Sequence, residues 1–144
     1  MKSMRLISAL VLVLVGGLLG GCATMSSNIS PGANLSAIKK IHVVKLPADS
    51  RGIERVIADE LNLMGYATTV GTVQDAPEDA DALLTYQDKW MWDITMYMLE
   101  LNVQVREPKT EIVMANATSY RPSLERKSPR EMAKEVLTEI FKKR

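Results

Sequence analysis

Few residue types in this chain could carry chemistry, and the two most reactive ones occur once each. Cys22 is the only cysteine and His42 the only histidine among 144 residues. A disulfide within one chain needs two cysteines, so packing and hydrogen bonds must hold the fold together. A metal site built from histidines and cysteines needs more ligands than these two residues supply. The pattern therefore favours a structural role for His42.

Carboxylates are the remaining candidates for catalysis. Asp88, Asp93 and Glu100 lie in the longest non-helical run, residues 82–106. A hydrolase would need at least two of them in one polar cleft, as acid and base. The chain has no glycine-rich phosphate loop, and the acidic segment 75–81 lacks the residue spacing of a calcium loop. We therefore expect a protein that is not an enzyme, with a carboxylate hydrolase as one alternative.

A group of large side chains in the same run is better suited to binding. Trp90 and Trp92 point to the same side of a strand, and Met96, Tyr97 and Met98 follow just beyond. Such residue types are enriched in the centres of interfaces or fill cores. Two interpretations stay open: the tryptophans pack under a helix, or they form an exposed patch that binds a partner or lipid. If both faces of this hairpin are apolar, one layer of helices can cover only one of them.

Alternation and helical spacing predict the elements that position these residues. Strands are expected at residues 38–46, 66–73, 82–93, 94–106 and 111–120, and helices at about 50–64 and 129–141. The first strand has apolar residues on both faces, which is typical of an interior strand. Asp49 or Ser50 is expected to cap the first helix. Residues 128–131, Ser-Pro-Arg-Glu, form a capping box with proline at the first helical position.

The strand at 94–106 alternates most regularly. Its odd positions are expected to share one buried face: Tyr97, Leu99, Leu101, Val103 and Val105. The even positions beyond residue 99 are polar, as in a half-buried antiparallel strand.

The predicted fold is a two-layer α+β sandwich in the order β-α-β-β-β-β-α. A mixed, mostly antiparallel sheet is covered on one face by both helices. This domain spans residues 38–144. Residues 22–37, rich in Ser, Asn and Gly, are expected to form a flexible tether about 20 Å long.

Residues 1–21 show the features of a secretory signal peptide. Lys2 and Arg5 form a positive head, and residues 6–19 are mostly apolar. This run is shorter than the ~20 residues of a comfortable membrane span. The four residues 19–22, Leu-Gly-Gly-Cys, resemble the lipobox of bacterial lipoproteins, which carry a type II signal peptide. A buried core cysteine or an uncleaved signal anchor fits this arrangement less well.

The lipoprotein resemblance implies a chemistry and a place for the chain. The signal peptide would be removed before Cys22, whose thiol would carry diacylglycerol and whose amino group would be acylated. No other cofactor is expected. Ala23, in the position where aspartate retains some lipoproteins in the inner membrane, implies the periplasmic side of the outer membrane, with the inner membrane as the alternative.

The balance of charges limits which classes of partner the chain is expected to bind. The chain has 18 Lys and Arg against 17 Asp and Glu, a balance that argues against nucleic acid and against binding to an anionic bilayer chiefly by charge. The basic residues near 121–130 and 142–144 are diluted by glutamates and are expected to form a solvated surface.

The domain also resembles small periplasmic lipoprotein domains of unknown function, which are similar in size and element order to auxiliary lipoproteins of envelope transport and assembly machines. This resemblance implies a non-catalytic binding or accessory module that docks an envelope protein. The docking surface would be the Trp90 and Trp92 hairpin or an exposed sheet edge. A carrier of lipid or a small ligand is the second alternative, and it requires an apolar cavity between helices and sheet.

Overall fold

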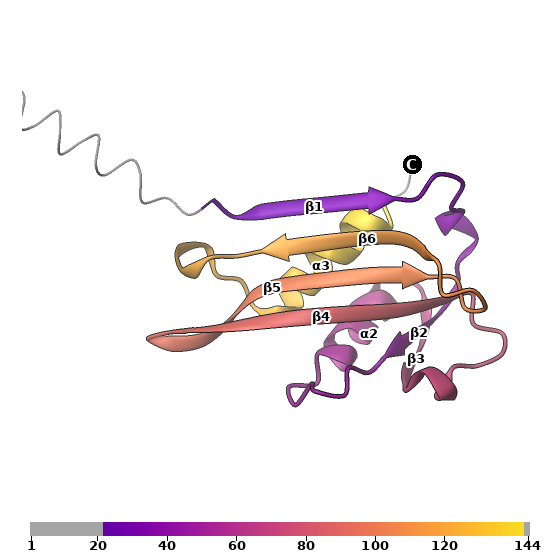
Figure 1. Ribbon diagram of the computed structural model, residues 1–144, viewed down its shortest axis with the longest axis horizontal. Coiled ribbons are helices and arrows are strands. Elements are labelled where there is room, and N and C mark those ends of the chain that lie inside the picture. The colour runs from indigo at the N-terminus through magenta and orange to yellow at the C-terminus, as the bar shows by residue number, and fades with distance from the viewer. Residues whose placement is uncertain (1–21, 143–144) are drawn as a thin grey trace, which may run out of the picture.

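The computed structural model describes residues 22–142. The predicted signal peptide, residues 1–21, lies outside this part. Within it, one six-stranded sheet has the strand order β1-β6-β5-β4-β2-β3 (Figure 1). The strands and α-helices are β1 Thr24–Ile29, β2 Lys40–Val44, α2 Ile53–Leu63, β3 Ala67–Gly71, β4 Ala82–Asp93, β5 Thr95–Arg106, β6 Val113–Tyr120 and α3 Pro129–Ile140. Three short 3-10 helices, η1 Leu35–Ala37, η2 Val73–Asp75 and η3 Ser123–Glu125, lie in the connections.

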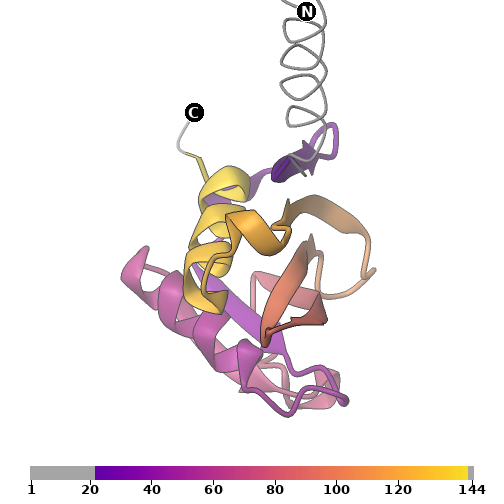
Figure 2. The same cartoon turned by 90° about the vertical axis from the view of Figure 1, so that its left-hand side faces the viewer.

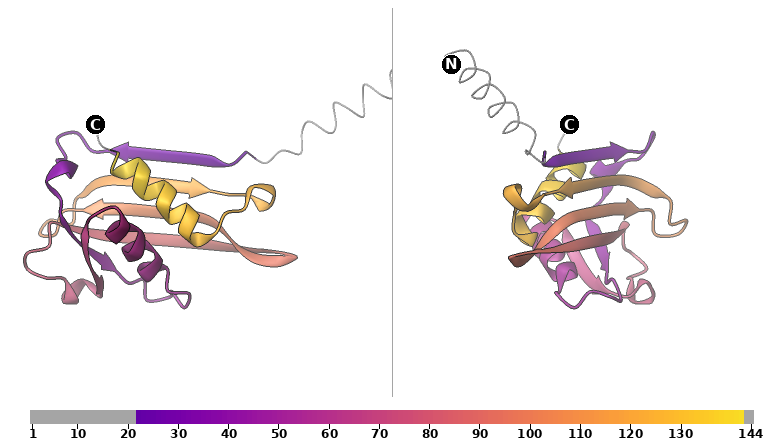
Figure 3. Two further views of the ribbon diagram at one scale, coloured as in Figure 1. Left: turned by 180° about the vertical axis from the view of Figure 1, so that it is seen from behind. Right: turned by 60° about the vertical axis from the view of Figure 1, so that its left-hand side comes forward.

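The sheet is mixed, and both α-helices cover the same face. β2 lies between β3 and β4 and runs parallel to both, whereas β1, β6, β5 and β4 are antiparallel neighbours. Figures 2 and 3 show α2 and α3 side by side on one side of the sheet. The predicted two-layer α+β sandwich is confirmed, and so is the interior position of the first predicted strand.

The segment predicted as a flexible tether instead supplies an edge strand. β1 pairs with β6 at six positions, from Thr24↔Tyr120 to Ile29↔Ala115. The observed order of strands and α-helices is therefore β-β-α-β-β-β-β-α. Met25 and Ile29 pack against the core, but two apolar residues are too few to create a period in the sequence. The strand forms because the edge of β6 offers backbone partners, which composition cannot reveal.

The predicted N-terminus of α2 differs in detail from the observed one. Gly52, in the left-handed conformation with φ 70°, is the N-cap. Asp49 still satisfies the orphan amides of the first turn, because its carboxylate accepts hydrogen bonds from the backbone N–H groups of Arg51 (2.6 Å), Gly52 (3.1 Å) and Ile53 (2.7 Å). Tyr86 donates its hydroxyl to the same carboxylate at 2.7 Å, which ties the helix start to β4.

The capping box of α3 is present as predicted. The Ser128 side chain accepts from the backbone of Glu131, and the Glu131 carboxylate accepts from the backbone of Ser128. The apolar stripe of α3 is buried against the sheet: Met132, Ala133, Val136, Leu137, Ile140 and Phe141. α3 packs against β6, β5 and β1, and inward side chains of β5 and β6 such as Leu101 and Ala117 belong to the same core. No helix within residues 22–142 is long and apolar enough to cross a membrane.

Candidate functional site

The β4–β5 hairpin extends past the rest of the sheet. β6 ends where Tyr120 pairs with Glu100, and Glu100 pairs with Lys89. Beyond that row β4 and β5 pair only with each other as far as Asp93↔Thr95, and Figure 1 shows this two-stranded ribbon projecting at one end. We call residues 91–96 the hairpin tip.

A β-bulge decides which side chains of the ribbon face the core. Lys89 pairs with Glu100 but the next residue, Trp90, pairs with Met98, so Leu99 is an extra residue in β5. A bulge of this kind shifts the alternation by one residue. The prediction that Tyr97 and Leu99 share the face of Leu101 is therefore wrong. Met98 takes the inward position and is 1% exposed.

The five residues predicted as a partner surface separate into buried and exposed members. Met98 is in the core and Tyr97 is buried. Trp90 is partly buried: it packs against the core, its indole N–H donates to Asp88, and the Arg51 guanidinium lies 4.3 Å from its ring centroid.

The other two predicted members remain exposed at the hairpin tip. Trp92 is 68% exposed, and Met96 is also exposed. The two tryptophans therefore do not form one wide aromatic surface, because Trp90 is half-buried whereas Trp92 is exposed.

The exposed apolar residues at this end of the molecule form a group of five. They are Met91, Trp92, Ile94 and Met96 of the hairpin tip and Leu124 of η3, of which Ile94 and Leu124 are 87% and 84% exposed. Ile94 makes the turn with φ 61°, a conformation that is a genuine outlier for a β-branched residue. Sequence patterns predict a turn near Asp93 but do not single out Ile94 or Leu124.

Arg126 holds the hairpin tip against the connection that contains η3. Its Nη2 donates to the main-chain oxygen of Asp93 and its Nη1 to Thr95 Oγ1, both at 2.7 Å. Its guanidinium also lies 4.2 Å from the ring centroid of Tyr97. Ser123 of η3 donates to the Asp93 carboxylate as well. These contacts tie the apolar tip to the connection before α3.

The three carboxylates that were candidates for catalysis do not lie together in one cleft. Asp88 accepts from Trp90, Glu100 pairs with Lys89 at 2.9 Å, and Asp93 pairs with Arg126 at 3.3 Å. Asp88 and Glu100 belong to neighbouring rows of the ladder and point to opposite faces of the sheet. The polar cleft that the hydrolase alternative requires is therefore not formed by these residues.

Most of the basic residues in the connection before α3 are paired with acids. Glu135 accepts from Ser119 at 3.0 Å, from Arg121 at 2.7 Å and from Lys127. Partial burial opposes ionisation of Glu135, but these hydrogen bonds outweigh it and lower its pKa. Arg130 pairs with the buried Glu60 at 2.5 Å. These acids balance much of the positive charge of the region, and the Arg121 and Glu135 side chains are largely buried rather than solvated as predicted.

His42 has the structural role that the sequence predicted. It is buried, with Nδ1 2.7 Å from Thr69 Oγ1 and Nε2 2.8 Å from the carbonyl oxygen of Thr72. A carbonyl only accepts, so Nε2 carries a proton and donates it to the Thr72 carbonyl oxygen. Within residues 22–142, no group of three or more His, Cys, Asp or Glu side chains could hold a metal ion.

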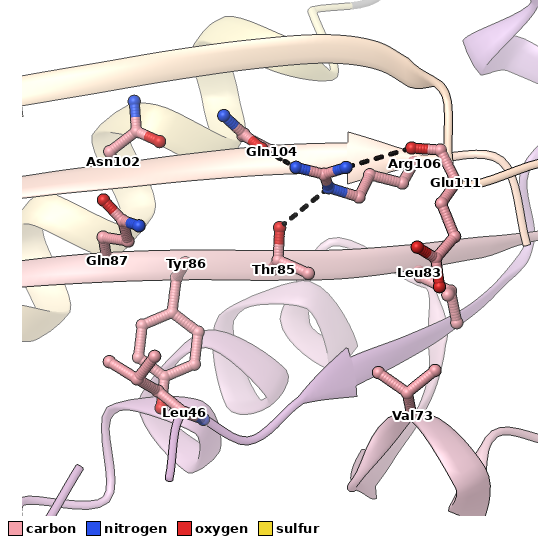
Figure 4. A pocket seen from close by; sticks show the side chains of 10 residues that line it. All are labelled: Leu46, Val73, Leu83, Thr85, Tyr86, Gln87, Asn102, Gln104, Arg106 and Glu111. Atoms are coloured by element: carbon pink, nitrogen blue, oxygen red, sulfur yellow. Dashed lines mark hydrogen bonds between the residues drawn. The ribbon is translucent and has the colours of Figure 1, made fainter. Parts of the chain in front are cut away.

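The helix-free face of the sheet carries a polar pocket of about 390 Å³ (Figure 4). Arg106 crosses it, donating to Gln104 Oε1 at 2.5 Å, to Thr85 Oγ1 at 3.3 Å and to the carbonyl oxygen of Glu111 at 3.0 Å. Figure 4 shows the Gln87 and Asn102 side chains on the same two strands. The pocket offers neutral amide and hydroxyl groups, with the Arg106 guanidinium held among them and the Glu111 side chain also in its lining.

Tyr86 of β4 lines this pocket, and its hydroxyl bonds to Asp49 just before the start of α2. Partial burial opposes ionisation of Asp49, but hydrogen bonds from the Tyr86 hydroxyl and from the Arg51 and Ile53 amides outweigh it and lower the pKa of Asp49. Burial, followed by the contact with Asp49, raises the pKa of Tyr86. Asp49 is therefore an anion and Tyr86 a neutral donor at neutral pH.

Comparison with known proteins identifies the fold. No protein-family model and no curated protein sequence matches the chain. Among solved structures, a PelC dodecamer from Paraburkholderia phytofirmans matches over 83% of this chain and 96% of that chain, with a TM-score of 0.57 and 15% identity. A variant of the same PelC matches with a TM-score of 0.55 and 18% identity, over 83% of this chain and 95% of that chain.

A PDZ domain protein from Parabacteroides distasonis matches with a TM-score of 0.54 and 9% identity. The match covers 85% of this chain but only 37% of that one. At these identities the chains share a fold, and PelC shares it over nearly its whole length.

Proposed function

We propose that the protein is an envelope lipoprotein, held by acyl chains on Cys22 at the periplasmic side of the outer membrane. Its domain is a non-catalytic accessory module that docks an envelope protein. The position of Cys22 carries this proposal. Cys22 is exposed, and only Ala23 separates it from β1. An acylated residue in this place would lie at the surface of the domain and hold it close to the membrane.

The shared fold supports the role as a binding module. A PelC protein with this architecture forms a dodecamer, so a domain of this kind can present surfaces for stable protein contacts. The filled space between helices and sheet supports the same role over the carrier alternative. The side chains there, including Ile41, Ile57 and Leu137, are at most 1% exposed.

We assign the docking surface to the helix-free face of β4 and β5 rather than to the two tryptophans. Trp90 is half-buried, whereas the pocket residues Gln87, Asn102 and Gln104 lie on a face that neither α-helix covers (Figures 2 and 4). Neutral amides bind backbone and side-chain groups of a partner without the desolvation cost of full charges.

Two measurements test the proposal. Labelling of cells with a fatty-acid analogue should mark the wild-type protein and leave Cys22→Ser unlabelled and uncleaved; continued labelling of the variant would overturn the assigned anchor. A photo-crosslinking residue at Gln87 should capture one specific envelope protein. The same probe at Asp59, exposed on α2, is the control, and equal capture at both positions would overturn the assigned surface.

A further inference from the structure

The hairpin tip and Cys22 lie at the same end of the molecule. One row of the sheet joins Thr24, Tyr120, Glu100 and Lys89 across β1, β6, β5 and β4. Because β1 and β4 are oriented oppositely along this ladder, residues before Thr24 and residues after Lys89 project in the same direction. Figure 1 shows the start of β1, the connection after β6 and the β4–β5 hairpin at one end.

The tip reaches at least as far as the anchor position. At about 3.3 Å per strand residue, Cys22 lies about 7 Å beyond the shared row and Trp92 about 10 Å beyond it. Three strand spacings of about 4.8 Å separate β1 from β4, so the two features lie about 14 Å apart across the sheet. With only Ala23 between Cys22 and β1, a membrane that holds Cys22 also meets the hairpin tip.

The chemistry of the tip suits the interface of a lipid bilayer. Trp92, Met91 and Met96 are exposed beside Ile94, and tryptophan is enriched at the level of lipid headgroups. Ile94 holds an unfavourable backbone conformation, with φ 61°. Nothing within the described part of the chain covers Ile94, so neither backbone preference nor internal packing accounts for an isoleucine there.

The charges around the tip are balanced. Asp93 and Arg126 pair with each other, and Lys127 pairs with Glu135; Glu125 and Lys89 are exposed. A contact based on apolar insertion, rather than on attraction to anionic lipid, fits this balance.

We propose that the hairpin tip inserts into the interfacial region of the same phospholipid leaflet that holds the acyl chains of Cys22. This proposal deepens the proposed function and rests on it. Two contacts about 14 Å apart resist rotation of the domain about its anchor, and the same arrangement points the opposite end, with the β5–β6 turn, away from the membrane.

Quenching by brominated phospholipid tests the insertion. The full chain, purified from its host and reconstituted in phosphatidylethanolamine and phosphatidylglycerol vesicles, carries Trp90→Phe so that Trp92 is the only tryptophan. The emission of Trp92 should shift to shorter wavelength and lose most of its intensity when brominated lipid replaces ordinary lipid. The half-buried Trp90, observed in the Trp92→Phe chain, should keep most of its emission.

Ile112 supplies a matched control, since it is an exposed isoleucine in the turn at the opposite end of β5 and β6. Ile112→Trp, in a chain without the two native tryptophans, should escape quenching. In the Trp90→Phe chain, the quenching of Trp92 should also be insensitive to the salt concentration.

The outcomes separate this proposal from the proposed function. If the chain is labelled by the fatty-acid analogue but Trp92 is not quenched, the insertion is overturned and the anchor stands. A protein crosslinked to the hairpin tip would then identify what binds there. Quenching of Trp92 without labelling shows that the tip contacts lipid but overturns the anchor, and with it the assignment of both to one leaflet. Equal quenching at Trp92 and at the Ile112 position also overturns the insertion, because it shows contact without a fixed orientation.

Discussion

Arg126 Nη2 donates a 2.7 Å hydrogen bond to the main-chain oxygen of Asp93, 33 residues away in the chain. This bond joins the connection before α3 to the turn of the longest hairpin. An isolated two-stranded ribbon is marginally stable in water, and the hairpin tip has no third strand beside it. Arg126 therefore supplies hydrogen bonds to the tip, at a place where no neighbouring strand is present to supply them.

Arg126→Gln should loosen the hairpin tip. The variant loses the paired donors to Asp93 and Thr95 and the contact with Tyr97. We expect faster amide hydrogen exchange at residues 91–97 and a loss of about 1–2 kcal/mol in the free energy of unfolding. Arg55→Gln, which removes an 83% exposed arginine of α2 and its 4.0 Å ion pair with Glu54, is the control for amide exchange at the tip. Unchanged exchange at the tip in Arg126→Gln would contradict the bracing role.

Ile94→Gly should stabilise the isolated domain. Glycine adopts a φ of 61° without steric cost, and the exposed isoleucine side chain gives up no packing. We expect a gain of about 1 kcal/mol in the free energy of unfolding, measured by urea denaturation without vesicles. Ile112→Gly, where φ is not positive, should give no gain. A destabilised Ile94→Gly would mean that the side chain packs within the domain.

Asp49→Ala should weaken the start of α2. The substitution removes the acceptor of three backbone amides and of the Tyr86 hydroxyl. We expect a loss of about 2 kcal/mol or more in the free energy of unfolding, since one lost cap alone costs about 1 kcal/mol. Asp59→Ala, exposed on the same helix, should change it by no more than about 0.5 kcal/mol. Equal effects of the two substitutions would contradict the capping role.

Glu135 should make stability depend on acidic pH. Its pKa in the folded state lies below the ordinary 4.5, so its contribution is present above about pH 4.5 and is lost as pH falls through the lowered pKa. We expect Glu135→Gln to be less stable than wild type at pH 7 and the difference to shrink below pH 4.5 in urea denaturation. Lys134→Gln, exposed on the same helix, should show no such convergence. A constant difference down to pH 3 would rule out the Glu135 carboxylate as the cause.

Local patterns predicted most of the elements correctly. The capping box at Ser128 and Glu131 and the apolar stripe of α3 follow from contacts within one turn of helix, and the structure contains both. The βαβ unit of β2, α2 and β3 follows from the change in period along residues 38–73. These features depend on neighbours in the sequence, so the sequence is sufficient to predict them.

The candidate site could be predicted only in part. The hairpin and its large side chains were recognised, but alternation extrapolated through Leu99 assigned Tyr97 to the wrong face. A bulge adds one residue to one strand, and nothing in the local sequence at Leu99 marks it. The bulge turns Met98 rather than Tyr97 toward the core. Arg51 and Arg126, which are distant in the chain, lie against Trp90 and Tyr97. Trp92 and Met96 stay exposed because the hairpin extends past the end of β6.

From its amino-acid order alone, the chain predicts a lipobox cysteine, a two-layer α+β domain and a hairpin rich in tryptophan and methionine. The tertiary structure decided where these parts lie relative to one another. β1 joined the sheet because β6 offered an unpaired edge, and this pairing places Cys22 beside the end from which Trp92 and Ile94 project. Side-chain periodicity indicates which face of an element is buried. The relative position of Cys22 and the hairpin tip depends instead on backbone pairing between segments about 90 residues apart, which composition does not reveal.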